Sequence, residues 1–264
     1  MLDKLTRNSS ARIQKVRHKQ IIDILRSNQA MLVRDLANEI GVSESTIRRD
    51  LEELQELEVV HRVHGGAVLE TDLEPPFETR QITHSLEKTQ IGQLAASMVS
   101  DGEVIFIDGG TTTEHIVPFL AERQNLTVVT SGLNICNKLS DLPHIHTIVI
   151  GGELHIESQS FTGVMTLEAL RIYGIRCDRA FIGAGGVSTR TGVTNRILDR
   201  VPIKQRVMEI STHKTVVVDS SKIGVTTLGH IAPIEAFDQL ITNESASENE
   251  IEAIRALGVS VALA

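Results

Sequence analysis

The first 70 residues alternate short stretches of helical hydrophobic periodicity with one stretch that favours β-structure. Apolar side chains recur three and four positions apart in three successive segments, which is the spacing of one face of an α-helix. They are Ile21, Ile22 and Leu25 in a segment that ends near Asn28, then Val33, Leu36, Ala37 and Ile40, and finally Ile47, Leu51 and Leu54. The pattern predicts three short amphipathic helices.

The connections between these helices have the chemistry of tight turns. Gly41 stands where the second helix should end, because glycine adopts the left-handed conformation of a helix C-terminus without a Cβ clash. Ser43 is a favourable N-cap for the third helix. The run Val59–Leu69 favours β-structure and is interrupted by a glycine pair, which predicts a hairpin. Residues 19–70 are therefore predicted to form a winged helix-turn-helix.

From residue 85 onward, apolar β-favouring runs alternate with helical stretches. Helical periodicity stops after Glu70, and the pair Pro75 and Pro76 favours an extended backbone, so residues 71–84 are predicted to be a linker. The predicted strands beyond it are Val104–Ile107, Thr127–Thr130, Thr147–Ile150, Ala180–Ile182, Thr215–Val218, Leu240–Thr242 and Val259–Leu263. Strands that are apolar on both faces and separated by helices are typical of a mostly parallel sheet covered on both sides. Residues 85–264 are thus predicted to form a larger α/β domain.

The composition favours a folded protein of the cytoplasm. Of the 264 residues, 41% are hydrophobic and 23% are charged, which excludes a disordered chain. No apolar run approaches the roughly 18 residues of a membrane helix, and the polar, basic amino terminus does not resemble a signal peptide. The two cysteines, Cys136 and Cys177, lie far apart in no CxxC pair. We therefore expect no disulfide framework, no metal, no cofactor and no membrane partner.

Charge is distributed unevenly along the chain. The formal net charge is -8, yet residues 1–49 hold ten Lys and Arg against five Asp and Glu, a net of +5. The remaining residues therefore carry -13. A basic DNA-reading module fused to an acidic domain has this asymmetry, and so does a basic tail on any globular protein. Residues 1–18 are interpreted as a basic amino-terminal extension without an assigned role.

The third predicted helix carries many hydrogen-bond donors away from its apolar stripe. Its first two turns, which are the part of a recognition helix that enters the major groove, hold hydroxyl and guanidinium groups, and five acids lie at its far end. The candidate DNA-binding residues are Ser43, Ser45, Thr46, Arg48 and Arg49 of this helix and Arg62 and His64 of the hairpin; the acids are Asp50, Glu52, Glu53, Glu56 and Glu58. The alternative is an ordinary solvated helix in which Arg48 and Arg49 pair with Glu52 and Glu53 four residues on.

A long and specific motif resembles the DeoR family of bacterial transcriptional repressors: LANEIGVSESTIRRDL at Leu36–Leu51, followed by RVHGGA at Arg62–Ala67. The resemblance runs from about Lys19 to the end of the chain. It implies that the helix-turn-helix binds operator DNA. It also implies that the larger domain resembles ribose-5-phosphate isomerase and coenzyme A transferases and acts as a sensor of phosphorylated sugars.

The segment Asp108–Thr113, which we call the cradle, has the parts of an anion-binding loop. The predicted strand that ends at Ile107 runs into Asp-Gly-Gly-Thr-Thr-Thr. Glycine lets backbone N–H groups approach an oxyanion, threonine adds donors, and Asp108 could accept a sugar hydroxyl. The alternative is a tight turn with a threonine cap. Pro118 removes one helical N–H, so the following helix should be kinked or should start late.

Other strand ends offer similar polar, glycine-bearing loops, and in open α/β sheets ligands bind beyond the carboxyl ends of the strands. For the phosphate itself Lys204 and Lys222 are the preferred cations, because both match basic positions of the family pattern. The complete candidate effector site is Asp108, Gly109, Gly110, Thr111, Thr112, Thr113, Thr130, Asn134, Gly152, Glu153, Asp178, Gly185, Lys204 and Lys222, with Arg190, Arg196 and Arg206 as weaker candidates.

Several sharper chemistries are disfavoured. The run Gly183–Gly186 is not GxGxxG, and no Walker A loop occurs. His144 and His146 have no further ligands at a recognisable metal spacing. The stretch before Lys204, where relatives often carry glutamates, reads Asp-Arg-Val-Pro-Ile, which disfavours isomerase catalysis. The sequence therefore predicts a homo-oligomeric, non-enzymatic DNA-binding regulator, a repressor of a carbohydrate-utilisation operon whose operator affinity a phosphorylated sugar controls. The alternative is a sugar-phosphate isomerase or transferase with an accessory DNA-binding domain.

Overall fold

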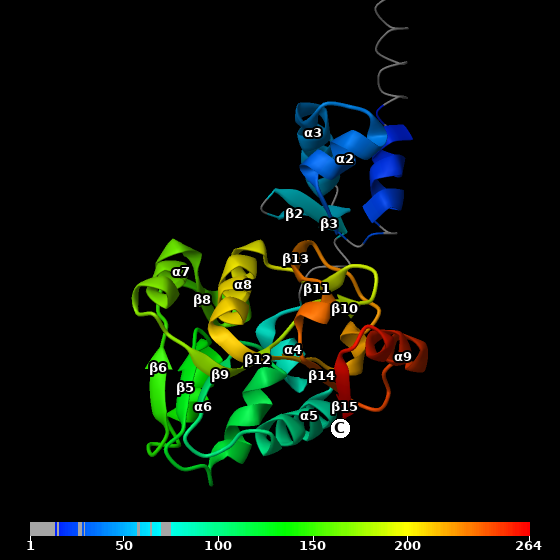
Figure 1. The fold of residues 1–264 in the computed structure, drawn as a ribbon. Coiled ribbons are helices and arrows are strands. Elements are labelled where there is room, and N and C mark those ends of the chain that lie inside the picture. Colours follow the sequence, from blue (N-terminus) through cyan, green and yellow to red (C-terminus); the bar gives the residue numbers. More distant parts are fainter. Residues whose placement is uncertain are drawn as a thin grey trace, which may run out of the picture. The chain divides into compact units, whose positions relative to one another are not determined.

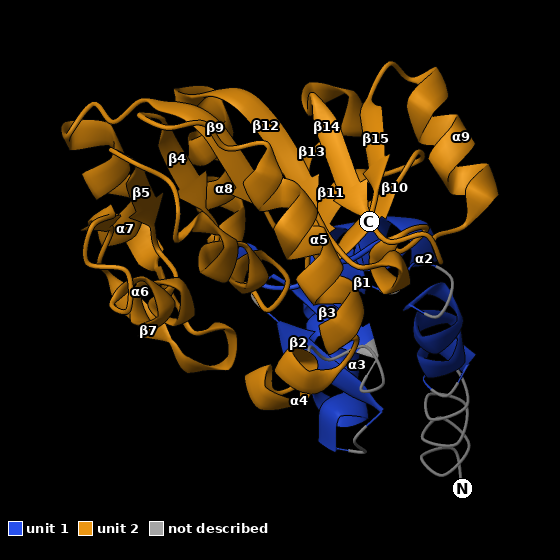
Figure 2. Cartoon of the chain, turned by 90° about the horizontal axis from the view of Figure 1, so that it is seen from below, with its two compact units in different colours: residues 1–74, 196–198, 226–228 blue, residues 75–195, 199–225, 229–264 orange. Residues whose placement is uncertain are grey.

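The computed structural model describes residues 14, 16–25, 28, 30–56, 59–63, 65–69 and 75–264. The chain divides into two compact units (Figure 2). The smaller unit comprises residues 1–74, 196–198 and 226–228, and the larger unit holds the rest. Within the described residues, no helix is both long enough and apolar enough to cross a membrane.

The smaller unit contains the predicted helices and hairpin. Residues 16–25 are helical, and they are followed by α2 (Val33–Ile40) and α3 (Glu44–Glu56). The hairpin consists of β2 (Val60–Val63) and β3 (Gly66–Leu69). A short strand that the sequence did not predict, β1 (Ala30–Leu32), pairs with β3 in an antiparallel three-stranded sheet of order β1-β3-β2. The winged helix-turn-helix is therefore confirmed, with one added strand.

The turn chemistry of this unit is as expected. Gly41 adopts the left-handed conformation with φ 76°, and its N–H donates to the carbonyl of Ala37 at the end of α2. The Ser43 hydroxyl accepts from the N–H of Thr46 at 3.2 Å, which caps α3. All three apolar stripes meet in one core, in which Leu36, Ile47 and Leu51 are fully buried together with residues of the first helix and of the hairpin.

The predicted linker is only partly irregular. Residues 71–74 lie outside the described residues, but Phe77–Ile82 form a helix, α4, immediately after Pro76. Proline is favourable just before or at the first position of a helix, because its missing N–H has no intrahelical partner there and its φ is already suitable. The prediction of an extended linker is therefore wrong for residues 77–82, which are helical.

The larger unit is built on a seven-stranded sheet, in which every pairing is parallel (Figure 1). The spatial order of its strands is β15-β14-β12-β9-β4-β5-β6. The strands are β4 (Val104–Ile107), β5 (Thr127–Thr130), β6 (His146–Val149), β9 (Cys177–Ile182), β12 (Ser211–Val217), β14 (Gln239–Thr242) and β15 (Ser260–Leu263). All seven predicted strands are present, and the prediction of a mostly parallel sheet is confirmed.

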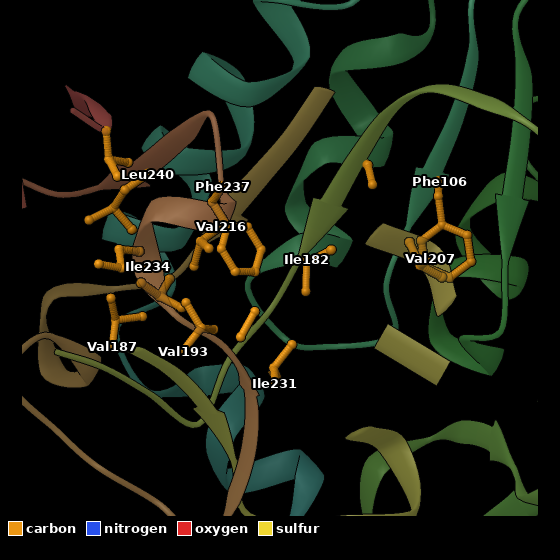
Figure 3. Packing of buried hydrophobic residues seen from close by; sticks show 14 of the residues in the cluster. Phe106, Ile182, Val187, Val193, Val207, Val216, Ile231, Ile234, Phe237 and Leu240 are labelled. Atoms are coloured by element: carbon orange, nitrogen blue, oxygen red, sulfur yellow. The ribbon is translucent and has the colours of Figure 1, made fainter. Parts of the chain in front are cut away.

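Side chains on the central strands alternate between two apolar cores, one on each face of the sheet. Phe106, Ile182 and Val216 face one core, which α7, α8 and α9 cover (Figure 3). Their neighbours Ile107 and Phe181 face the other core, which α5, η2 and α6 cover. The helices are α5 (Ser85–Ser97), the 3₁₀ helix η2 (Thr113–Leu120), α6 (Leu133–Leu139), α7 (Gly163–Ile172), α8 (Val201–Ile210) and α9 (Glu248–Ala256). Burial on both faces explains why the strands are continuously apolar.

Two smaller antiparallel sheets escaped the sequence analysis. One is the hairpin of β7 (Glu153–His155) and β8 (Ser160–Thr162), and the other joins β10 (Gly186–Ser188), β11 (Gly192–Asn195) and β13 (Gly229–Ala232). Their strands mix polar residues and glycine with apolar ones, as in Glu153–His155 and Gly192–Asn195, and so form no continuous apolar run. Four short 3₁₀ turns complete the fold of the described residues: η3 (Ile156–Ser158), η4 (Leu198–Arg200), η5 (Ser220–Lys222) and η6 (Ile234–Ala236).

Candidate functional site

The first two turns of α3 present a polar, exposed surface. Its hydroxyl groups lie close together: the Ser43 Oγ is 2.9 Å from that of Ser45 and 2.8 Å from the Thr46 Oγ1. Ser43 and Ser45 are exposed, Thr46 is half-buried, and Arg48 and Arg49 are exposed on the same helix. The apolar positions Ile47 and Leu51 face the core instead. The donors predicted from sequence therefore share the solvent side of α3.

The arginines of the smaller unit do not form the ion pairs of the alternative interpretation. Arg48 Nη2 lies 2.7 Å from Glu44 Oε2, one turn earlier rather than one turn later. Arg62 of β2 lies 2.8 Å from Glu52 of α3, so the hairpin and the helix are linked across their exposed surfaces. Arg49 makes no ion pair with any described residue. Exposed pairs of this kind contribute little to stability, so these guanidinium groups can exchange a carboxylate for a phosphate at small cost. The predicted contact His64 lies outside the described residues.

Asp50 differs from the sequence interpretation, which placed it with the acids at the exposed far end of α3. It is buried, with 1% of its surface exposed, and its carboxylate is held by the Arg17 guanidinium, with Nη2 2.7 Å from Oδ1. His18 Nε2 lies 3.3 Å from the same oxygen. The position follows from helical spacing, because Asp50 lies three residues after Ile47 and four before Leu54 on the inward face. Asp50 thus ties the first helix to the recognition helix.

The second candidate site lies at the carboxyl edge of the parallel sheet. From the middle of the sheet, β4, β5 and β6 follow one another toward one edge, and β9, β12, β14 and β15 follow one another toward the other edge. The order in which strands are added therefore reverses between β4 and β9, although all the strands are parallel. Such a switch point separates the loops that follow the two strands and is where open α/β sheets bind ligands. The loops here are the cradle after β4 and the segment that begins at Gly183 after β9.

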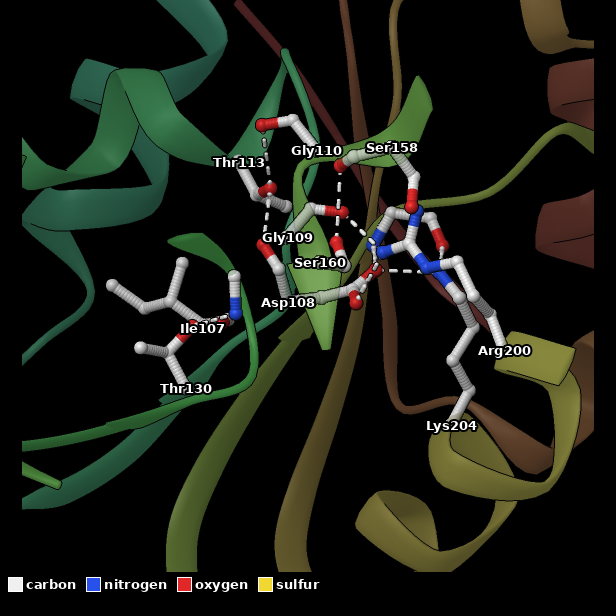
Figure 4. Close-up of polar contacts among 12 residues, drawn as sticks. Ile107, Asp108, Gly109, Gly110, Thr113, Thr130, Ser158, Ser160, Arg200 and Lys204 are labelled. Atoms are coloured by element: carbon white, nitrogen blue, oxygen red, sulfur yellow. Dashed lines mark hydrogen bonds and ion pairs between the residues drawn. The ribbon is translucent and has the colours of Figure 1, made fainter. Parts of the chain in front are cut away.

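Asp108 is the centre of a buried ion cluster at this point (Figure 4). Its Oδ1 lies 2.8 Å from Arg200 Nη2, and its Oδ2 pairs with Lys204 and accepts from the N–H of Gly183 at 3.1 Å. Arg200 and Lys204 also donate to the carbonyls of Gly109 and Gly183. Burial opposes ionisation of the carboxyl, but the two cations outweigh it and hold the pKa of Asp108 below its ordinary value.

Several cradle residues are engaged within the protein. The Thr113 hydroxyl donates to the Asp108 carbonyl at 2.6 Å, and the Thr130 hydroxyl donates to the Ile107 carbonyl at 2.7 Å (Figure 4). A Cβ on Gly109 would lie 2.3 Å from Ser160 Oγ, so this glycine admits the β7–β8 hairpin. The predicted cradle is therefore partly a packed turn, as its alternative interpretation held. The segment beyond it is a 3₁₀ helix containing Pro118, which fits the expected irregularity.

Lys88 is the most informative residue that the sequence analysis missed. It lies on α5 with 3% of its surface exposed, and its ammonium donates to the Arg80 carbonyl and to Thr111 Oγ1 at 3.1 Å. Among the described residues it has no carboxylate within ion-pair distance. Burial lowers the pKa of Lys88; the charge of Asp219 opposes this shift, and Lys222 adds to it. Its helical spacing could have identified it, because Lys88 lies three residues before Ile91 and seven before Ala95 on the buried face of α5.

A buried acid and an amide complete this side of the site. Glu114 accepts from Gln81 Nε2 and from Asn134 Nδ2, both at 2.9 Å. Asn134 also donates to the Gly110 carbonyl at 3.1 Å, while its Oδ1 is buried without a hydrogen-bond partner. An unsatisfied buried acceptor is costly. Asn134 therefore has an acceptor available for a hydroxyl donor.

The remaining predicted effector residues divide into two groups. Lys222 is half-buried on the turn after β12, near enough to Lys88 to influence its pKa. Other candidates are Thr112, Gly152 and Gly185 in loops of the same unit and Glu153 at the start of β7; among the described residues, none of them has a hydrogen bond or ion pair with the Asp108 cluster. Gly152 has a packing role, because a Cβ there would lie 2.0 Å from Thr166 Oγ1.

Asp178 was assigned to the wrong edge of the sheet. It lies at the start of β9, where its carboxylate accepts from the N–H of Val104 at 2.8 Å. Strand β9 begins three residues earlier than predicted, and Val104 opens β4, whereas Asp108 follows the end of β4. The length of a parallel strand therefore separates Asp178 from the cradle. Arg206 pairs with Glu209 on the surface of α8, and Arg190 is exposed.

The chemistry of the site is that of anion binding. Basic side chains gather in or beside it, namely Lys88, Arg200, Lys204 and Lys222 with Arg80 nearby, together with the acids Asp108, Glu114 and Asp219. No group of three or more His, Cys, Asp or Glu in the described residues has the arrangement of a metal site. The Lys88 ammonium is buried and has no carboxylate within ion-pair distance among the described residues; the charges of Asp219 and Glu114 act on it from farther away.

Comparisons with known proteins match two parts of the chain to domains of one family. Residues 17–72 match the family model described as a DeoR-like helix-turn-helix domain, and residues 83–244 match the DeoR C terminal sensor domain. The chain is 33% identical over 230 residues to the HTH-type transcriptional regulator IolR of Bacillus subtilis, covering 87% of this chain and 91% of that protein. It is 32% identical over 231 residues to the glycerol-3-phosphate regulon repressor of Escherichia coli, with the same coverage of 87% and 91%.

Solved structures show more distant similarities. The full-length sorbitol operon regulator SorC from Klebsiella pneumoniae has a TM-score of 0.39 and 12% identity, and the match covers 90% of this chain and 97% of that one. The ribose 5-phosphate isomerase A of Methanocaldococcus jannaschii has a TM-score of 0.40 and 18% identity, and the match covers 53% of this chain and 55% of that one.

Proposed function

Because the chain belongs to the DeoR family of transcriptional regulators, we propose that it represses a carbohydrate-utilisation operon and that a phosphorylated sugar in its larger unit controls its affinity for operator DNA. The relatives named as repressors of the glycerol-3-phosphate regulon and, putatively, of the aga operon support the carbohydrate assignment. The solvent face of α3 supports the DNA-binding part, since its donors are exposed and its guanidinium groups are weakly engaged.

The observation that carries the effector assignment is the buried ammonium of Lys88. A charge removed from water without a counter-ion is unfavourable, and an entering anion offsets that cost. A phosphate monoester supplies two negative charges and three acceptor oxygens for the Lys88 ammonium, the Thr111 hydroxyl and the Lys222 side chain. The unsatisfied Asn134 Oδ1 is an acceptor for a hydroxyl of the sugar. Together they favour a ligand that is anionic at one end and hydroxylated at the other.

Asp108 has a different role from the one expected at first. Its carboxylate is already saturated by Arg200, Lys204 and the Gly183 N–H. We infer that Asp108 positions these two cations and the two loops of the switch point rather than accepting a sugar hydroxyl. The buried ion pairs of Asp108 thereby connect the loop after β4 with the loop after β9. A ligand that changes these ion pairs also changes the relative position of the two loops.

Coupling to DNA follows from linkage. Suppose that the sugar phosphate binds more tightly to the conformation or oligomer that cannot engage two half-sites. It then weakens operator binding by a factor set by the ratio of its affinities for the two states. By the same linkage, bound DNA weakens the binding of the sugar phosphate by an equal factor. Couplings of this kind are typically about 1–3 kcal/mol. We infer that the working form is a homo-oligomer in the cytoplasm, because a single recognition helix makes too few contacts for genomic specificity.

We propose that the larger unit senses its ligand without turning it over. The buried carboxylates of the site are engaged: Asp108 by two cations, Glu114 by two amides, and Asp219 by the N–H and hydroxyl of Ser221. General acid–base catalysis needs a carboxylate that can exchange a proton with the sugar. Incubation with ribose 5-phosphate, followed by NMR, should show no ketose phosphate; steady conversion would favour the isomerase alternative.

The decisive experiment is a thermal-shift screen of sugar phosphates and their phosphate-free sugars against the full chain. A ligand at about 100 times its Kd stabilises the protein by about 2.7 kcal/mol, and we expect this only with phosphorylated members. Lys88→Met should abolish the shift, whereas Lys214→Met, which removes a cation elsewhere in the unit, should retain it. A shift that survives in Lys88→Met contradicts the proposed site.

A further inference from the structure

Helix α7 is apolar on the side that faces solvent. Its side chains Val164, Met165 and Ile172 are 74%, 69% and 75% exposed, and Tyr173, which follows the last turn, is 77% exposed. The fully buried residues of the helix are only Thr166 and Leu170. A helix that is apolar nearly all round is normally covered on all sides. In α7 the apolar side chains on the outer side are left uncovered.

The exposed surface continues onto the neighbouring hairpin. Leu154 of β7 is 46% exposed and lies opposite Phe161 of β8, just before α7 begins, and Ile156 after β7 is 67% exposed. We call these six side chains the α7 patch: Leu154, Ile156, Val164, Met165, Ile172 and Tyr173. Its apolar area is on the order of several hundred Å², which exceeds the scattered exposure normal for a monomer and approaches the roughly 800 Å² that each partner buries in a stable complex.

We propose that the α7 patch is the interface through which two copies of this chain associate. The charges on the patch favour a second copy over a charged partner of another kind. On α7, Glu168 and Arg171 lie between the apolar side chains, with Arg171 Nη1 3.1 Å from Glu168 Oε1, so the helical part of the patch carries one charge of each sign. The exposed acids Glu153 and Glu157 lie at the hairpin end of the patch. A two-fold interface requires a surface that complements itself, and an apolar stripe with one acid and one base meets this condition.

In a two-fold dimer, the point at which the two α7 helices cross determines which residues of the two copies lie opposite each other. When two α7 helices cross antiparallel near Glu168 and Ala169, Met165 of one copy lies opposite Ile172 of the other, and Val164 lies opposite Tyr173. The Glu168 carboxylate of one copy then lies within one turn of the Arg171 guanidinium of the other, which can replace the internal pair. The interface rests on the proposed function in one respect only: a repressor with one recognition helix per chain needs a second copy.

The place of the patch also suggests what it does. The β7–β8 hairpin, which includes Leu154, contacts the cradle and the loop after β5 on its inner side. Ser160 fills the space beside Gly109 of the cradle, and the Phe161 N–H donates to the carbonyl of Ser131 after β5 at 2.7 Å. One hairpin therefore joins the effector site to the interface. A ligand that moves the cradle changes the surface on which the second copy sits.

The test is the oligomeric state of the full chain, measured by light scattering after size exclusion over a range of concentrations. Ile172→Asp combined with Tyr173→Asp should weaken self-association at least about 30-fold and lower the molar mass to half or less of the unaltered value. The matched control is Leu257→Asp, at another exposed apolar position at the end of α9, which Figures 1 and 2 place on the opposite side of the larger unit. It should leave the mass unchanged.

A second variant keeps the proposal testable if the charged one fails to fold. Glu168→Cys places a thiol near the two-fold axis and should give a disulfide-linked dimer on mild oxidation, whereas Leu257→Cys should not. A monomeric unaltered chain, an undiminished mass in the folded charged variant, or no linked dimer from Glu168→Cys overturns the proposal. None of these measurements involves DNA or sugar phosphate, so their outcome is independent of whether the proposed regulatory function is correct.

Discussion

Replacing Asp108 by asparagine is the most informative perturbation of the larger unit. The substitution preserves shape but removes the one negative charge between two buried cations, Arg200 and Lys204. Breaking a buried ion pair by removing one partner typically costs about 3–5 kcal/mol, because the other charge remains buried without compensation. For a unit of this size, roughly 2–4 °C of melting temperature corresponds to each kcal/mol, so we expect a decrease of about 6–20 °C.

The assay is thermal unfolding followed by circular dichroism at neutral pH, with Asp199→Asn as the control. Asp199 immediately precedes Arg200 but is exposed, and its substitution should change the melting temperature little. A double-mutant cycle with Lys204→Met measures the pairwise coupling, expected to be about 0.5–3 kcal/mol. If Asp108→Asn loses less than about 1 kcal/mol, or if the cycle shows no coupling, the ion cluster does not hold the two loops together.

The same cluster predicts a pH dependence with a definite sign. The pKa of Asp108 is lower in the folded chain than in the unfolded chain, where a free aspartate titrates near about 3.9. The stability that it contributes is therefore fully present above that value and is lost as pH falls through the lower, folded pKa. The stability difference between the unaltered chain and Asp108→Asn should accordingly be constant near neutral pH and shrink in acid. A difference that grows on acidification refutes the assignment.

Three further predictions test other parts of the account. Arg49→Ala should weaken operator binding about 5- to 150-fold in a gel-shift titration if the guanidinium contacts a base; unchanged affinity means that another face of α3 reads DNA. Gly92→Ala should destabilise the larger unit by about 1–3 kcal/mol in denaturant titration, because its Cβ would lie 2.3 Å from the His115 carbonyl oxygen; full stability would mean that α5 and η2 pack less closely. Burial raises the pKa of the Cys177 thiol to about 11, so a thiol reagent at pH 8 should modify half-buried Cys136 first and Cys177 only on unfolding; rapid reaction of both thiols would contradict the buried position of β9.

The sheet was predictable from sequence because each of its strands can be identified from a few consecutive residues. Each central strand is buried on both faces, so each appears as a continuous apolar run such as Val104–Ile107, and the helices between such runs imply parallel pairing. The recognition helix was predictable for the same reason, since Gly41 and Ser43 mark its turn within a few residues. The strands that were not predicted lack such a run: β1 has only three residues, and the strands of the two small antiparallel sheets mix polar residues and glycine with apolar ones.

The site was only partly predictable, because its members are brought together by topology. Asp108 is separated by more than ninety residues from both Arg200 and Lys204, and it meets them only because β4 and β9 are neighbours in the sheet. Lys88 was overlooked because a lysine on a helix is normally solvated, and only its place in a buried stripe distinguishes it. Asp178 was misplaced because the start of β9 cannot be located from an apolar run that begins later.

The central claim is that a sugar phosphate bound at Lys88 controls the affinity of this chain for its operator. The direct measurement is operator affinity, by fluorescence anisotropy, with and without the sugar phosphate that gives the largest thermal shift, for the unaltered chain and for Lys88→Met. We expect the ligand to change operator affinity of the unaltered chain by about 5- to 150-fold. We expect Lys88→Met to bind the operator normally and to ignore the ligand. An equal response in Lys88→Met would contradict the claim.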